Sequence, residues 1–348
     1  MLDKKRVICG ISGGVDSSAA CLMLKNMGFD VVALYISMWN EDSERGVAQL
    51  EAARKCAEEA GVKFEHVDMT ERFLSHVVAP FVQTYFEGRT PNPCVLCNPL
   101  LKFATLFNVA DKLSAYYIAT GHYAGAGYSE EYSSYMISSI KDEKKDQSYF
   151  LYGLADMDIS RIIFPLSNMS KDEVRALVRE NGLCNADAPD SEDICFMKDG
   201  DYRRFIEERS ADEPLRGNFI RENGEIIAPH NGIHAYTLGQ RKGLNVAAGE
   251  RIFVTEKRSN GDIVLSSRDN LYKREIRLIN VKKFVEAQEN TQYFAKIRSV
   301  GKPSGCNVVC NQDGVCVVFD EPQFAPSPGQ SVVVYDGKGY VILGGEIA

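Results

Sequence analysis

The sequence predicts an α/β protein: a doubly wound parallel sheet of the Rossmann-like type, then a small central domain and a C-terminal β-barrel. Two observations predict this order. Strand and helix patterns alternate over residues 1–125, whereas short strands and turns dominate from about residue 250 onward. The length of 348 residues also exceeds what one ordinary core accommodates, so two or three domains are expected.

The alternation begins with an apolar strand, followed by a helix that Gly28 is placed to end. The predicted elements are, in order, a strand at residues 7–11, a helix at 17–27, a strand at 30–38, a helix at 46–60, a strand at 63–67 and a strand at 113–120. The last strand runs into Gly121 and His122. Because ligands of such sheets bind at the carboxyl ends of the strands, His122 is a candidate site residue rather than a core histidine.

In the second half of the chain the residue pattern changes twice. Residues 150–210 have mostly helical patterns, and residues 212–249 are rich in Gly, His and short apolar runs. Six strand-like stretches then follow, with turn pairs such as Asn260-Gly261 and Asp336-Gly337 between them. This pattern is typical of a small barrel or sandwich.

The charge distribution leaves two interpretations open. The net charge is −8, but the segment from Arg241 to Lys302 holds 14 Lys and Arg against 7 Asp and Glu. A local basic surface on an acidic protein can bind a phosphate backbone. An ordinary mixed-charge surface would show the same composition.

The pattern of the first residues and the spacing of the cysteines indicate the cellular compartment. The sequence shows no signal-peptide pattern and no apolar run of membrane-spanning length. The ten cysteines are scattered over a long chain, unlike the dense disulfide framework of a small secreted domain. We therefore expect a cytoplasmic protein with no membrane partner, in which each cysteine is either buried filler or part of the chemistry.

A glycine- and serine-rich loop joins the first strand to the first helix. Paired glycines let a backbone approach a phosphate closely, and a helix start offers free N–H groups. The candidate nucleotide-binding residues are Gly10, Ile11, Ser12, Gly13, Gly14, Val15, Asp16 and Ser17. Asp16 is the one acid in this anion-binding loop, so we expect it to hold Mg²⁺. The pattern lacks the Walker A lysine and the spacing of the dinucleotide fingerprint. It resembles the pyrophosphate loop of N-type ATP pyrophosphatases, which implies ATP.

Three cysteines are candidates for chemistry. Cys94 and Cys97 form a C-x-x-C with prolines around it, which could be a redox pair, half a metal site or an iron–sulfur ligand pair. A second C-x-x-C or a His pair at zinc spacing is missing. Cys306 and Cys310 fit the core of predicted strands. Acidic and polar neighbours surround Cys195, so we expect it to be exposed and reactive.

Five motifs follow one another along the chain in an order that is typical of one protein family. They are GRTPNPCVLCN at residues 88–98, ATGHYA at 119–124, KDQSYFL at 145–151, DSEDICF at 190–196 and YTLGQRKGL at 236–244. Together they resemble the tRNA-specific 2-thiouridylases over nearly the whole chain. The resemblance implies an ATP pyrophosphatase catalytic domain at 1–198, a central tRNA-binding domain at 199–268 and a C-terminal β-barrel domain at 269–348.

The resemblance also assigns roles to residues. Cys97 matches the family's nucleophile, and Cys195 matches the cysteine that carries a persulfide. Ile36 and Gly121 match positions near the adenine and ribose. The residues that match contacts with the target base or tRNA are Asn92, Pro93, Cys94, Lys145, Asp146, Gln147, Arg298 and Ser299. Some members of the family have Asp where this chain has Cys94, so an acid–base role at that position does not transfer.

The implied reaction adenylates the 2-oxygen of the wobble uridine in tRNA and then replaces it with sulfur. The sulfur arrives as a persulfide from a cysteine desulfurase or a sulfur-relay protein. Since thiols are mostly protonated near neutral pH, we expect the site to lower the pKa of its cysteines. Three alternatives stay open: a [4Fe–4S] cluster on Cys94, Cys97 and Cys195, an ATP-dependent amidotransferase or ligase for a small molecule, and an RNA-binding protein without activity.

Overall fold

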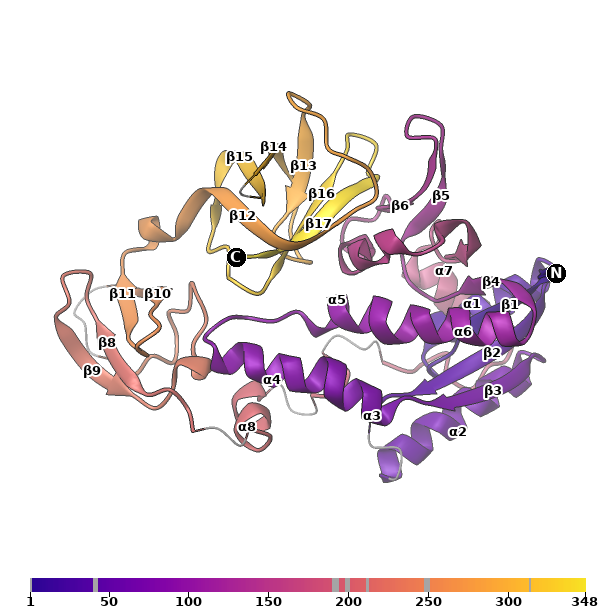
Figure 1. Cartoon of the computed structure of the whole chain (residues 1–348). Helices are drawn as coiled ribbons and strands as arrows, with labels where there is room; N and C mark the ends of the chain where they lie inside the picture. The colour runs from indigo at the N-terminus through magenta and orange to yellow at the C-terminus, as the bar shows by residue number, and fades with distance from the viewer. Residues whose placement is uncertain are drawn as a thin grey trace. The chain divides into compact units, whose positions relative to one another are not determined.

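The computed structural model describes residues 2–39, 43–189, 194–197, 201–210, 213–246, 251–312 and 314–348 (Figure 1). The chain forms two compact units, each built from three segments. Unit 1 comprises Met1–Val77, Cys94–Phe196 and Lys338–Val341, and unit 2 comprises Val78–Pro93, Met197–Gly337 and Ile342–Ala348. Residues 190–193 of the motif around Cys195 lie outside the described residues.

Unit 1 is built on a parallel sheet, as predicted, and this sheet has five strands in the order β3-β2-β1-β4-β7. The strands are β1 (Asp3–Gly10), β2 (Asp30–Ser37), β3 (Lys63–Asp68), β4 (Ala115–Ala119) and β7 (Ile162–Ile163). The chain moves outward from β1 to β3 and then returns to β4 on the other side of β1. The loops that follow β1 and β4 therefore flank the point where the strand order reverses, which is the usual ligand site of such sheets.

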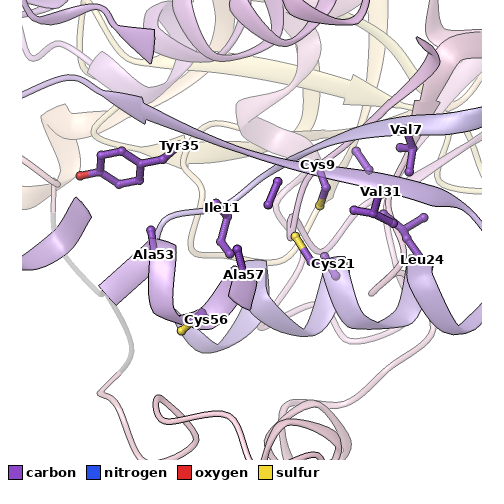
Figure 2. Close-up of a cluster of buried hydrophobic side chains, with 13 residues drawn as sticks. Val7, Cys9, Ile11, Cys21, Leu24, Val31, Tyr35, Ala53, Cys56 and Ala57 are labelled. Atoms are coloured by element: carbon purple, nitrogen blue, oxygen red, sulfur yellow. The ribbon is translucent and has the colours of Figure 1, made fainter. Parts of the chain in front are cut away.

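Helices cover both faces of this sheet. Helices α1 (Val15–Asn26) and α2 (Glu44–Glu59) bury apolar side chains against β1 and β2 in one cluster, which includes Cys9 (Figure 2). The next residue of β1, Gly10, faces Leu106 of helix α6 (Ala104–Lys112), 3.8 Å from where its Cβ would be. Because successive strand residues point to opposite faces, α6 packs on the face opposite α1 and α2.

The remaining elements of unit 1 are mostly short. They are α3 (Thr70–Phe73), a π-helix at Leu74–Val78 shared with unit 2, the hairpin β5 (Gly125–Ser129) and β6 (Ser134–Ser138), 3₁₀-helices at Ser148–Phe150, Tyr152–Asp156 and Ile159–Arg161, and α7 (Lys171–Glu180). The prediction of a mostly helical segment at 150–210 is thus wrong over its first part. There, single buried residues such as Leu151 and Leu154 anchor short turns, and no apolar stripe of helical period continues.

Three consecutive pieces form one apolar helical stretch from Pro93 to Lys112: α5 (Pro93–Cys97), a π-helix (Asn98–Phe103) and α6. Its 20 residues have the length and composition of a membrane span, so the expectation that no such run exists was wrong. Half of the stretch is buried within the protein. Leu101, Phe103 and Leu106 are almost completely buried, which is typical of a core helix in a globular protein.

Unit 2 contains an open sheet and a barrel. The sheet has the order β10-β11-β8-β9 and the closed barrel has the order β12-β15-β14-β13-β16-β17, which confirms the predicted C-terminal barrel. The strands are β8 (Gly217–Ile220), β9 (Ile226–His230), β10 (Phe253–Lys257), β11 (Ile263–Ser266), β12 (Tyr272–Lys283), β13 (Tyr293–Lys296), β14 (Ser304–Asn311), β15 (Gly314–Phe324), β16 (Ser331–Tyr335) and β17 (Val341–Ile347). Of the two barrel cysteines expected in the core, Cys306 is buried but Cys310 is exposed, because it lies near the end of β14.

Among its described residues, unit 2 also contains the α-helices α4 (Ala79–Phe86) and α8 (Tyr202–Glu207) and 3₁₀-helices at Ile233–Ala235 and Arg268–Leu271. Aromatic rings join them. Tyr85 of α4 stacks on Tyr202 of α8 at 5.0 Å between ring centroids. Phe86 stacks on His234 at 5.2 Å, so α4 belongs to this unit although it precedes most of unit 1 in the chain.

A four-residue piece near the C-terminus, Lys338–Val341, belongs to unit 1. The Ser139 N–H donates to the Gly339 carbonyl at 2.8 Å, and Tyr340 forms a β-bridge with Ser138. Lys338 pairs with Glu131 of the hairpin at 2.7 Å. The hairpin β5–β6 is therefore bordered by a segment that lies about 200 positions later in the sequence.

Candidate functional site

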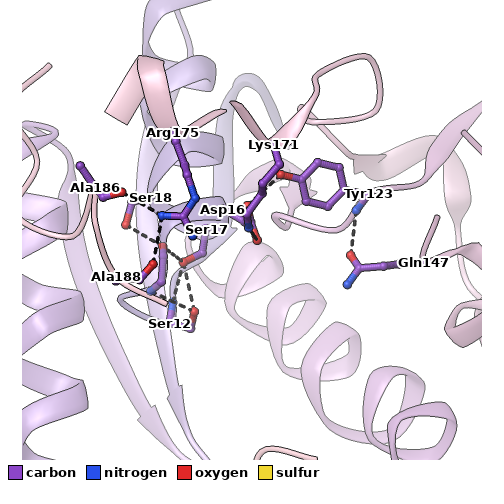
Figure 3. Close-up of polar contacts among 11 residues, drawn as sticks. Ser12, Asp16, Ser17, Ser18, Tyr123, Gln147, Lys171, Arg175, Ala186 and Ala188 are labelled. Atoms are coloured by element: carbon purple, nitrogen blue, oxygen red, sulfur yellow. Dashed lines mark hydrogen bonds and ion pairs between the residues drawn. The ribbon is translucent and has the colours of Figure 1, made fainter. Parts of the chain in front are cut away.

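The predicted phosphate loop lies between β1 and α1, and serine hydroxyls fix its shape (Figure 3). The Ser17 hydroxyl donates to the Gly14 carbonyl at 3.0 Å and accepts from the Ser12 N–H at 3.1 Å. Gly13 has φ of +79°, which favours glycine. Helix α1 begins after Gly14 with no side-chain cap, so its first N–H groups can bind an anion such as a phosphate.

The end of β4 lies directly against this loop. A Cβ atom on Gly121 would be 2.8 Å from the Asp16 carbonyl carbon and 2.9 Å from the Ser17 nitrogen. Only glycine permits that approach. The structure therefore brings Gly121 to the loop, and half-buried Ile36 lies near the carboxyl end of the neighbouring strand β2.

Asp16 has two partners that the sequence analysis missed (Figure 3). The Lys171 ammonium donates to both carboxylate oxygens at 2.7 Å, and the Tyr123 hydroxyl donates to one of them at 2.8 Å. The Lys171 side chain is only 14% exposed, so this ion pair is shielded from solvent on the lysine side. The loop thus contains a fixed carboxylate–ammonium pair at the start of α1, and the role of Asp16 as a Mg²⁺ ligand stays a prediction.

Asn185, which the sequence analysis also missed, forms hydrogen bonds with the phosphate loop. The Asn185 side-chain amide donates to the Gly13 carbonyl at 2.8 Å and to the Ser18 hydroxyl at 2.9 Å. Arg175 of α7 donates to the carbonyls of Ala186 and Ala188, both at 3.0 Å (Figure 3). Since no motif marks this segment, the sequence offered no signal for it.

The three candidate cysteines form one electrostatic cluster around Lys102, because the charges of Cys94, Cys97 and Cys195 all act on the Lys102 ammonium. Burial would lower the pKa of Lys102, but the negative charges of the three cysteines in their thiolate form raise it overall. Cys97 is buried, and its sulfur lies 3.7 Å from that of Met38. Cys195 is exposed, as predicted.

The expectation that the site lowers the thiol pKa is wrong for two of these cysteines. Burial raises the pKa of Cys97 to about 12, and the charge of Lys102 offsets only part of that rise. Burial likewise raises the pKa of Cys94, again against the effect of Lys102. The physical reason is that a thiolate loses its hydration in the interior, and one cation does not replace it.

His122 lies in the same region of unit 1. Burial lowers its pKa to about 3, and the charge of Lys102 lowers it further. Its ring lies 2.8 Å from the Thr120 hydroxyl oxygen and packs near the rings of Phe103 and Phe164. The imidazole is therefore neutral near pH 7.

The Lys145–Gln147 stretch has internal structural partners. The buried Asp146 carboxylate accepts from the hydroxyl and the N–H of Ser148 at 2.9 and 3.2 Å. Gln147 accepts from the Tyr123 N–H at 2.9 Å and so steadies the residue that contacts Asp16 (Figure 3). Lys145 is half-buried.

The other predicted contact residues belong to unit 2 or border it. Asn92 is half-buried and Pro93 is buried at the start of α5, and Gln330 donates to the carbonyls of the preceding Thr90 and Pro91 at 3.0 and 3.2 Å. Arg298 is exposed and donates to the Ala325 carbonyl at 2.8 Å, while Ser299 is half-buried. The Arg298 guanidinium also donates to the Phe324 carbonyl at 3.5 Å, and its five N–H groups exceed these two bonds.

Three family models match consecutive parts of the chain. They are a tRNA methyl transferase HUP domain over residues 5–199, a tRNA methyl transferase PRC-barrel domain over 203–268 and an aminomethyltransferase β-barrel domain over 268–347. The first of these matches more than half of the chain.

Relatives match over the full length. The tRNA-specific 2-thiouridylase MnmA 2 of Caldanaerobacter subterraneus subsp. tengcongensis is 38% identical over 361 residues, covering 100% of this chain and 98% of the relative. The tRNA-specific 2-thiouridylase MnmA of Clostridioides difficile is 37% identical, covering 100% and 99%. That of Fusobacterium nucleatum, MnmA 2, is 37% identical, covering 99% of each.

Proposed function

Because the chain belongs to the tRNA-specific 2-thiouridylase family, we propose that it uses ATP to replace the 2-oxygen of the wobble uridine in tRNA with sulfur. The observation that carries this proposal is the pairing, within unit 1, of an uncapped phosphate loop with a cluster of three cysteines and a lysine. A small-molecule amidotransferase or ligase would need the loop but not the cysteine cluster.

The loop supports the first step. The uridine 2-oxygen attacks the α-phosphorus of ATP, pyrophosphate leaves, and the oxygen becomes part of a bound AMP group. The backbone N–H groups at the start of α1 would bind the phosphates, with Gly121 and Ile36 near the nucleoside. Asp16, which is one-third exposed, would hold Mg²⁺, and the bound ion would supply positive charge beside the leaving pyrophosphate.

The cysteines supply the second step. The terminal sulfur of a persulfide on Cys195 bonds to C2 of the uridine, and the C2–O bond breaks so that AMP leaves. Cys97 attacks the inner sulfur of the persulfide, which gives a Cys97–Cys195 disulfide. The transferred sulfur gains two electrons, and the two thiols lose them. A dithiol reductant must then restore both thiols before the next turnover.

Lys102 would assist the proton loss that this step requires. The Cys97 thiol has a pKa of about 12, so its proton leaves only when a cation or a reaction partner stabilises the thiolate. Lys102 is the cation that lowers this pKa. His122 is neutral and can serve as a hydrogen-bonding group beside the target base, together with Asn92, Pro93 and Cys94.

An iron–sulfur variant of the same reaction has one observation in its favour. The charges of Cys94 and Cys195 both act on Cys97, and all three cysteines act on Lys102, which fits a set of three thiolate ligands. Such a [4Fe–4S] cluster would leave one iron open to bind sulfide. We favour the persulfide route because it needs only two cysteines. Thiolation by iron-free protein with a persulfide donor would support that route, and strict iron dependence would overturn it.

The partners follow from this reaction. The protein would act in the cytoplasm on tRNA and receive sulfur from a cysteine desulfurase or a sulfur-relay protein. We propose a catalytic domain at 1–198, a tRNA-binding domain at 199–268 and a barrel at 269–348. Lys145, Asp146, Gln147, Arg298 and Ser299 would contact tRNA.

Nucleoside mass analysis tests the proposal. We expect 2-thiouridine in tRNA incubated with the protein, ATP, Mg²⁺ and a persulfide source, and none when ATP is left out. Cys97→Ser and Cys195→Ser should abolish the product, whereas Cys310→Ser, an exposed cysteine of the barrel, should leave it unchanged. Absence of 2-thiouridine with every tRNA and sulfur donor supplied would overturn the assignment.

A further inference from the structure

A second group of sulfur ligands lies in unit 1, on residues that the proposed reaction does not use. Cys56 and Glu59 occupy α2, and Cys184 lies in the segment after α7. Their ligand atoms all lie within 4.8 Å of one another. The two sulfurs are 3.9 Å apart, and the Cys184 N–H donates to the Glu59 carboxylate at 2.7 Å. Residues three apart on a helix share a face, so α2 presents Cys56 and Glu59 to Cys184 together.

The two sulfurs are not bonded to each other, and their separation is compatible with a shared zinc ion. A disulfide requires sulfurs about 2.05 Å apart. Two thiolates on a tetrahedral zinc ion, with Zn–S bonds of about 2.3 Å, lie about 3.8 Å apart. The observed 3.9 Å matches the second value without any movement of the backbone.

We propose that Cys56, Cys184 and Glu59 bind one zinc ion, with water as the fourth ligand. Binding forms two Zn–S bonds and one Zn–O bond, and the two thiol protons pass to solvent. No oxidation state changes, so the step needs no oxidant or reductant. Thiolates and carboxylates are both ligands that Zn²⁺ takes in proteins, and a water in the fourth position suits a site with two exposed members.

Electrostatics favour a cation in this group. Burial raises the pKa of Cys56 to about 11, a hydrogen bond from Ser18 lowers it, and the nearby Cys184 and Glu59 raise it again. A divalent cation reverses this repulsion, because coordination deprotonates a thiol outright. Lys55 pairs with Glu59 at 3.9 Å, but its side chain is 62% exposed and the pair is weak.

The position of this zinc site connects it to the phosphate loop. Asn185 follows Cys184 directly and donates to the Gly13 carbonyl and the Ser18 hydroxyl. Zinc would therefore fix the Cys184–Asn185 segment beneath the loop and tighten nucleotide binding, and a bound nucleotide must then tighten zinc binding by the same factor.

Cobalt titration tests the site without an activity assay. The full chain, reduced and metal-free, should carry Cys94→Ser, Cys97→Ser and Cys195→Ser to remove the other sulfur cluster. We expect one equivalent of Co²⁺ with thiolate-to-cobalt charge-transfer absorption, displaced by Zn²⁺. Adding Cys184→Ser, at an exposed position, should weaken Zn²⁺ binding at least 100-fold, whereas Cys310→Ser should not change it.

Two results would overturn the zinc site: no charge-transfer band, or a band that survives Cys184→Ser. If the protein bound no Zn²⁺ and instead formed a Cys56–Cys184 disulfide, the zinc site would be rejected in favour of a redox pair. The link to the loop rests on the proposed nucleotide site and has its own measurement. Zinc affinity should rise about 5-fold or more with a non-hydrolysable ATP analogue, and an unchanged affinity would overturn the coupling alone.

Discussion

Burial of the Cys97 thiol predicts an unusual pH dependence of its alkylation. With a pKa of about 12, the thiolate fraction at pH 8 is about 10⁻⁴. An exposed thiol with a pKa of about 8.5 is about one quarter thiolate at the same pH. Because the thiolate is the reactive form, the alkylation rate of Cys97 should rise about tenfold per pH unit from pH 7 to 9.5 without reaching a plateau.

Mass spectrometry of the alkylated Cys97 peptide measures this rate in the protein without tRNA. Restricted access slows alkylation equally at every pH, so the slope reports the pKa alone. Lys102→Met should slow the reaction at each pH, because it removes the charge that lowers the pKa of Cys97. Lys112→Met, at an exposed position near the end of the same helix, is the matched control. A plateau with a midpoint near 8.5 would refute the reasoning.

Three further predictions concern the loop and the barrel. Gly121→Ala should reduce ATP binding at least 10-fold by calorimetry, since its Cβ would collide with the Asp16 backbone, while Gly127→Ala, with open space around it, should not. A double-mutant cycle of Asp16→Asn and Lys171→Met in thermal unfolding should give a coupling energy of about 1–3 kcal/mol, and additive effects would contradict the ion pair. Arg298→Ala should reduce the salt-dependence slope of tRNA binding by about one unit without changing ATP binding in the absence of tRNA, and an unchanged slope would show that Arg298 contacts no phosphate.

The sequence was informative where the signal is local. The apolar strand from Val7 to Ile11 follows from its hydrophobic pattern, and two glycines follow from short-range sterics, since Gly13 has φ of +79° and Gly28 has φ of +89°. The parallel sheet and the barrel could be predicted because strand patterns and turn pairs repeat along the chain. The first part of the 150–210 segment could not be predicted, because single buried residues without a period give no helix or strand signal.

The site was predictable only in part, for the same reason. Asp16 and Lys171 are 155 positions apart, and Asn185 and Gly13 are 172 apart, so no spacing links them. Lys102 lies outside the five motifs, so nothing in the sequence marked it as a site residue. The raised pKa of Cys97 could not be anticipated either, since it depends on how much protein surrounds the sulfur rather than on its neighbours in the C-x-x-C.

The two units alternate along the chain, which constrains the order in which they can fold during synthesis and where the chain can be truncated. The polypeptide passes between the units five times, and the last passage into unit 1 is the piece Lys338–Val341. During synthesis, the hairpin β5–β6 is complete long before the strand segment that borders it exists. A chain truncated before Lys338 would lack the Gly339 carbonyl that accepts from Ser139, and in the nascent chain the hairpin would keep an open edge until the Lys338–Val341 piece is synthesised.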